Sequence, residues 1–163
     1  MKSEPSKRIV LEELRRLFDA NYSASDILDG KLQNLLSFSS AIVGLAAPII
    51  FTIPKDQRGI LFLFPLTIVV GLYVFLFYVV VEGSKPAAYS FPISMNMETL
   101  RNKYLVKSES IALEQDILDH LHYIEQAVQM NKSKARAVQI ATEVMFLIVI
   151  FLVLTVGVVF ALP

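Results

Sequence analysis

The sequence predicts an all-α membrane protein with three transmembrane helices, and three observations support this prediction. Hydrophobic residues make up 55% of the 163 residues, and the mean hydropathy of +0.56 is high for a soluble domain. These residues gather into three blocks, each near the roughly 20 residues that a helix needs to cross a bilayer. Polar helical patterns and stretches with Pro and Gly separate the blocks. The length is that of one domain.

Residues 1–22 are predicted to form an N-terminal cytoplasmic amphipathic helix. Within residues 6–20, the apolar side chains share one helical face and most charged side chains lie on the other. Such a helix either lies on the inner leaflet or packs on the rest of the cytoplasmic part. About thirty polar or amphipathic residues precede the first long apolar run, which is unlike a cleavable secretory signal. We therefore expect the first span to stay in the mature protein.

A transmembrane hairpin is predicted for residues 24–81, with spans at about 32–53 and 60–81. Each span has about the length that roughly 30 Å of hydrocarbon requires of a helix. The polar stretch 54–59 between them is typical of a tight turn. The second span is rich in aromatic residues, and we expect these rings mainly to face lipid.

Local patterns add detail to the first span. Ser23 followed by Asp26 has the spacing of a capping box, so a new helix is expected to begin near Ala24. Pro48 predicts a kink in the outer third of the span. Small side chains let a second helix approach closely, and overlapping pairs of them predict span packing. These small residues are Ser37, Ser40, Ala41 and Gly44.

Residues 82–143 are predicted to form a cytoplasmic linker and helices. The linker contains proline and glycine, and a short helix over 97–106 is expected to follow it. From Ser108 onward no proline or glycine occurs until Gly157. We therefore expect one long cytoplasmic helix, amphipathic and coiled-coil-like, that continues without a break into the third span at 144–163.

Apolar residues recur along this long helix in alternating steps of four and three. Such heptad spacing predicts a packed seam, and we expect homo-oligomers to form through it. The predicted seam comprises Ile117, Leu121, Ile124, Val128, Asn131, Ala135 and Val138. Asn131 either fixes the register or oligomer number, or it is an ordinary amide at a wet end of the bundle. The same count reaches Thr142 and Met145 at the membrane.

The distribution of basic residues predicts how the multi-pass chain is oriented in its membrane. Six of the 15 Lys and Arg residues lie within residues 1–31 and seven within 82–143, whereas the 54–59 turn has two. By the positive-inside rule, the N-terminus is cytoplasmic and the C-terminus lies outside. Three basic residues just before the third span form either an inner-leaflet anchor or part of a partner surface. They are Lys132, Lys134 and Arg136.

Few side chains offer catalytic or metal chemistry. The chain has no Cys and no nucleophile elbow or glycine-rich phosphate loop. His120 and His122 point to nearly opposite sides of a helix, whereas a helical metal pair needs a spacing of three or four. His120 with Asp116, or His122 with Asp119, would form a site only across an oligomer interface. We therefore expect no enzyme activity and no cofactor or metal.

Charge also narrows the classes of partner. The formal net charge is +0, so no direct contact with nucleic acid is expected. No Asp, Glu, Lys, Arg or His lies inside the predicted spans, which disfavours a pump or secondary transporter. The expected partners are the lipid bilayer and further copies of the chain.

Two stretches resemble a known family. Asp29-Gly30-Lys31 precedes LQNLLSFSSAIVGL at the start of the first span, and LDHLHYIEQAVQMNKSKARAVQIATEVM, downstream of Glu98 to Tyr104, leads into the last span. Both are similar to small bacterial and archaeal transmembrane effectors of antiviral defence, namely the Pycsar transmembrane effectors and the related SLATT effectors. The resemblance implies a non-enzymatic effector that oligomerises and disrupts or depolarises the inner membrane. The implied trigger is a cyclic nucleotide or a soluble sensor protein.

Two other functions are compatible with the same architecture. The chain would serve as a membrane-anchoring scaffold subunit if its cytoplasmic helices docked soluble partners. It would serve as a small oligomeric channel if ions crossed the membrane without any trigger.

Overall fold

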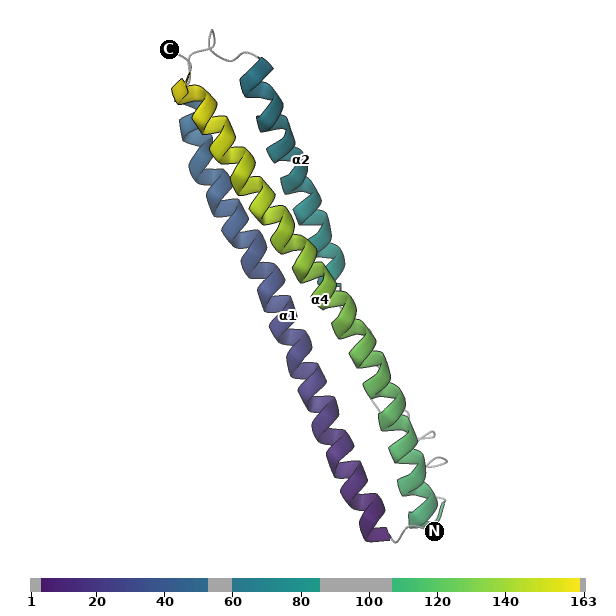
Figure 1. Cartoon of the computed structure of the whole chain (residues 1–163). Helices are drawn as coiled ribbons and strands as arrows, with labels where there is room; N and C mark the ends of the chain where they lie inside the picture. The colour runs from purple at the N-terminus through teal and green to yellow at the C-terminus, as the bar shows by residue number, and fades with distance from the viewer. Residues whose placement is uncertain (1–3, 53–59, 86–106, 162–163) are drawn as a thin grey trace. The chain divides into compact units, whose positions relative to one another are not determined.

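The computed structural model describes residues 4–52, 60–85 and 107–161, and the regular structure within these ranges is entirely α-helical (Figure 1). The helices are α1 (Glu4–Thr52), α2 (Ile60–Gly83) and α4 (Glu109–Ala161). An all-α fold is therefore confirmed for this part of the chain. The predicted turn at 54–59 and the predicted helix at 97–106 lie outside the described residues.

Two of the helices contain stretches long and apolar enough to cross a membrane. These stretches lie within Phe62–Gly83 of α2 and Glu109–Gly157 of α4. They overlap the second and third predicted spans. The apolar end of α1 adjoins residues 53–59, which the structure does not describe. The first span stays a prediction, and so does the total of three membrane spans.

The helices contribute to two compact units. Of the described residues, unit 1 contains 4–27 and 107–133, and unit 2 contains 28–52, 60–85 and 134–161. Both α1 and α4 therefore supply residues to each unit, whereas α2 belongs to unit 2 alone.

α1 is a single helix of 49 residues, so the predicted helix boundary near Ala24 is wrong. An N-cap residue has non-helical backbone angles, whereas Ser23 lies inside α1. The side-chain amide of Asn21 donates a hydrogen bond to the Leu17 carbonyl one turn earlier, at 2.8 Å. Ser25 is buried at 1% exposure. The local capping pattern is overridden because this stretch packs as a helix within unit 1.

α4 is a single helix of 53 residues, which confirms the uninterrupted helix expected from Ser108 onward. The amides of Ile111 and Ala112 each donate to the Ser108 carbonyl at 3.0 Å, and these bonds form the first turn. Helix-breaking residues are absent until Gly157, through which the helix continues.

Unit 2 is a three-helix bundle with an apolar core. Its core residues come from α1, α2 and α4, and they are Leu32, Ala46, Val69, Leu76, Val79, Val80, Ala141, Val144, Ile148 and Leu152. Gly83 is the most crowded of the described glycines, because an added Cβ would lie 2.8 Å from the Ala137 Cβ and 3.0 Å from Leu32 Cδ1. Only glycine fits there without a shift of neighbouring atoms.

The direction of the helices in unit 2 follows from their contacts. Ser40 of α1 meets Tyr73 of α2, whereas the earlier Leu32 lies beside the later Gly83, so α1 and α2 are antiparallel. The outward face of α2 carries exposed aromatic rings, as the lipid-facing prediction requires. These rings are Phe64, Phe75, Phe77 and Tyr78.

Candidate functional site

The buried line along α4 has heptad spacing, but it lies one residue N-terminal to much of the predicted seam. The buried residues at intervals of seven are His120, Ala127, Lys134, Ala141, Ile148 and Thr155. Leu121 and Ala135 of the predicted seam are exposed, and its other members are half-buried. The seam's role between copies of the chain stays a prediction.

α1 has an equivalent buried line. Its residues, at intervals of seven or fourteen, are Leu11, Ser25, Leu32, Ser39 and Ala46. Small side chains allow two helix backbones to approach closely, which explains why alanine is buried on both helices and serine on α1. Sequence reasoning missed these lines because it selected large apolar residues, which flank the close contact.

Ion pairs join α1 to α4 within unit 1. Lys7 Nζ lies 3.1 Å from a carboxylate oxygen of Glu114, and Arg8 is paired with Glu109. Arg15 Nη2 lies 3.3 Å from Asp116 Oδ2. The basic side of the amphipathic N-terminal helix thus contacts acidic groups of α4. In this unit the helix packs on another protein segment, which is the second of the two expected roles.

Asp116 also contacts His120 in a buried pair on α4. The Nδ1 atom of His120 lies 3.1 Å from Asp116 Oδ1 and 2.9 Å from the Asp116 carbonyl oxygen. His122 is exposed, and its Nε2 contacts the side chain of Gln126. Among the described residues no group of three or more His, Cys, Asp or Glu is arranged to hold a metal.

Asn131 forms a hydrogen bond between the two helices of unit 1. Its amide nitrogen donates to the Asn21 carbonyl of α1 at 2.8 Å. This hydrogen bond makes Asn131 a helix-facing amide that joins two positions of the helices in unit 1. A role of Asn131 in fixing the register or the oligomer number stays a prediction.

The three residues of the predicted basic patch differ in how far they are buried. Lys132 and Arg136 are exposed, as a surface patch requires. Lys134 is 6% exposed, and its Nζ lies 2.5 Å from Asp29 Oδ2 of α1. Including Lys134 in a surface patch was therefore wrong, because its ammonium is held by a carboxylate between two helices. Asp29 belongs to the Asp29-Gly30-Lys31 stretch that carried the resemblance.

The predicted small-residue packing is present at one residue of the four. Ser40 shares a hydrogen bond of 2.7 Å with the Tyr73 hydroxyl of α2. Ser37, Ala41 and Gly44 are exposed, so they do not pack closely on any of the residues that the structure describes. Ser39, which the sequence analysis did not select, is fully buried instead.

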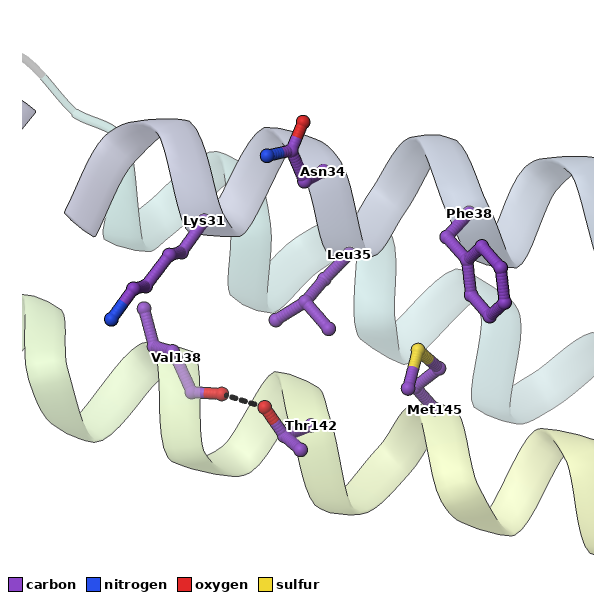
Figure 2. A pocket seen from close by; sticks show the side chains of 7 residues that line it. All are labelled: Lys31, Asn34, Leu35, Phe38, Val138, Thr142 and Met145. Atoms are coloured by element: carbon purple, nitrogen blue, oxygen red, sulfur yellow. Dashed lines mark hydrogen bonds between the residues drawn. The ribbon is translucent and has the colours of Figure 1, made fainter. Parts of the chain in front are cut away.

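A groove lies between α1 and α4 in unit 2, with a volume of about 470 Å³ (Figure 2). It is lined by Lys31, Asn34, Leu35, Phe38, Val138, Thr142 and Met145. Lys31 and Val138 lie at one end, and Phe38 and Met145 at the other (Figure 2). The Thr142 hydroxyl donates to the Val138 carbonyl at 2.8 Å, so its polarity is satisfied within α4.

Unit 1 has a groove of similar volume, about 470 Å³, with a different charge pattern. Arg8 and Arg15 line it, but their partners Glu109 and Asp116 line it too. Glu12 adds another acidic group. This groove therefore carries no excess of positive charge for an anionic ligand.

No protein-family model matches the sequence, and no curated protein or solved structure is significantly similar to the chain.

Proposed function

We propose that the chain is a non-enzymatic membrane effector of prokaryotic antiviral defence, which oligomerises and depolarises the inner membrane when a nucleotide signal or a sensor protein triggers it. The proposed topology has spans at 32–53, 60–81 and 144–163, with the N-terminus cytoplasmic and the C-terminus outside. Its proposed partners are the lipid bilayer and further copies of the chain. The defence role comes from the resemblance of the Asp29-Gly30-Lys31 stretch and the α4 sequence.

One observation supports the proposal most directly. α4 is an unbroken helix that supplies ion-paired residues such as Asp116 to unit 1 and core residues such as Ile148 to unit 2. A partner that changed the pairing of α1 with α4 in unit 1 would act on a helix whose other half contains apolar membrane-type sequence. Coupling through one continuous helix needs no catalytic group.

The topology has a direct test because the chain has no Cys. Gln57→Cys, in the predicted outer turn, should react with a membrane-impermeant maleimide in intact spheroplasts. Lys107→Cys, before α4, should react only after lysis. Equal labelling of the two variants in intact spheroplasts would contradict the proposed orientation.

The effector role is tested in bacteria that carry the gene with its genomic neighbours. After viral challenge, a potential-sensitive dye should report depolarisation before lysis. Leu121→Asp places a charge on the predicted seam and should prevent both higher assemblies and depolarisation. Leu118→Asp is the matched control, because Leu118 is an exposed leucine of α4 outside that seam. Cells that die with an unchanged potential would rule out the effector role.

A scaffold function is the second candidate, because unit 1 exposes large apolar side chains. Examples on α4 are Ile111 and Leu118, which are 53% and 56% exposed. Exposed apolar groups of this kind suit a protein partner. Stoichiometric co-purification of a soluble protein, with no conductance change in liposomes, would favour the scaffold. Ion flux in liposomes without any partner or ligand would instead favour a small channel.

A further inference from the structure

The groove between α1 and α4 in unit 2 combines an apolar floor with a single cation (Figure 2). Leu35 and Phe38 line it from α1, and Val138 and Met145 line it from α4. Lys31 is exposed, and its ammonium has no hydrogen bond or ion pair with any residue in 4–52, 60–85 or 107–161. The groove therefore has one unsatisfied charged end and a lining that is apolar except for the side chains of Asn34 and Thr142.

This arrangement suits an amphipathic, anionic ligand. The volume of about 470 Å³ lies within the roughly 300–1,000 Å³ of typical ligand pockets. Apolar lining stabilises a hydrocarbon chain, whereas an ammonium pairs with a phosphate. The Thr142 hydroxyl is already bonded to the Val138 carbonyl, so a hydrocarbon chain beside it would not leave it unsatisfied. Asn34, the other polar lining residue, is exposed and keeps contact with its surroundings outside the groove.

The predicted membrane position identifies the source of such a ligand. Lys31 immediately precedes the first predicted span, on the side that the basic residues mark as cytoplasmic. A lysine at this level extends its ammonium toward lipid headgroups. The cytoplasmic leaflet is also the leaflet whose negative surface attracts basic groups.

We propose that this groove binds one anionic glycerophospholipid, with the phosphate at Lys31 and an acyl chain along Leu35 and Phe38. The inference rests on the membrane placement in the proposed function, but it does not depend on depolarisation. A bound lipid would fill the space between α1 and α4 in unit 2, and it would stabilise their pairing by mass action.

Native mass spectrometry of the full chain in mild detergent provides the test, with phosphatidylglycerol and phosphatidylcholine as probes. The wild type should retain one phosphatidylglycerol in preference to phosphatidylcholine. Lys31→Gln should reduce this preference about fivefold, because it removes one lysine at the membrane surface. Lys107→Gln is the matched control, since Lys107 is exposed, does not line the groove and lies outside the predicted basic patch, and it should keep the preference.

A second variant tests the apolar part of the groove. Val138→Phe should fill the groove and lower retention of both lipids, with circular dichroism confirming that the helices persist. Equal retention of the two lipids by the wild type would overturn the proposal. So would an equal effect of Lys107→Gln and Lys31→Gln, or full lipid retention by a helical Val138→Phe variant. None of these readouts depends on membrane potential, so failure here is distinct from failure of the effector role.

Discussion

Lys134 of α4 and Asp29 of α1 form a largely buried ion pair in unit 2, with 2.5 Å between Nζ and Oδ2 and side-chain exposures of 8% and 29%. One helical turn further along, Leu32 and Ala137 both lie against Gly83 of α2. The pair therefore lies next to the crowded contact at Gly83, and it joins one position of α1 to one position of α4.

Breaking this pair from the Asp29 side should destabilise the bundle. Asp29→Asn leaves a buried ammonium without its carboxylate, and we expect a loss of about 2 kcal/mol, less than for a fully buried pair because Asp29 keeps some contact with water. Thermal unfolding in detergent, followed by circular dichroism, measures the effect. The double variant Asp29→Leu with Lys134→Met should recover most of the loss. A double variant less stable than Asp29→Asn would contradict this account.

Gly83 should not tolerate a side chain. Gly83→Ala places a Cβ 2.8 Å from that of Ala137, and such overpacking costs about 1–3 kcal/mol. The gain in helix propensity is only about 1 kcal/mol. A lower unfolding temperature is therefore expected, with partial rescue by Ala137→Gly.

Gly71→Ala provides the control for this variant within the same helix. A Cβ on Gly71 meets nothing within 4 Å, so the substitution should leave stability unchanged or raise it slightly. Equal destabilisation by the two alanine variants would show that close packing at Gly83 is not the cause.

The hydrogen bond between Ser40 and Tyr73 should make a measurable contribution to the contact between α1 and α2. Tyr73→Phe removes it and should cost about 0.6 kcal/mol, since hydrogen bonds between membrane helices average that value. Ser40→Ala should cost a similar amount, and the double variant little more than either one. Tyr78→Phe, on an exposed residue of α2, serves as the control. Additive losses in the double variant would show that the two residues do not interact.

Lys85 should titrate above its ordinary value. Its Nζ lies 2.5 Å from Glu82 Oε2, and this hydrogen bond raises the pKa of Lys85 from 10.5. The interaction with Glu82 favours the charged ammonium of Lys85. Its stabilising effect on the folded state is therefore present below the ordinary pKa of lysine and is lost as pH rises through the raised pKa. Glu82→Gln should bring the pKa back toward 10.5, which carbon-13 NMR of the lysine side chain can follow. A pKa unchanged by Glu82→Gln would exclude Glu82 as the cause.

Several features of the fold were predictable because they depend on local sequence. The blocks of apolar residues predicted the positions of α2 and the apolar half of α4, since a run of that length and composition favours a helix in any context. The absence of proline and glycine after Ser108 predicted one continuous α4. Heptad spacing on α4 was also visible in the sequence, because it follows from the period of the helix.

Which face of each helix is buried was decided by tertiary structure. Close approach of helix backbones favours small side chains, so Ser39 and Ala141 are fully buried while the larger Leu121 remains 48% exposed. Lys134 is buried because Asp29, 105 positions earlier, supplies its carboxylate. The capping pattern at Ser23 does not start a new helix for a related reason. α1 continues through Ser23 because this stretch packs as a helix within unit 1. A single sequence encodes helical periods, but the partner that covers each position depends on residues far away in the chain.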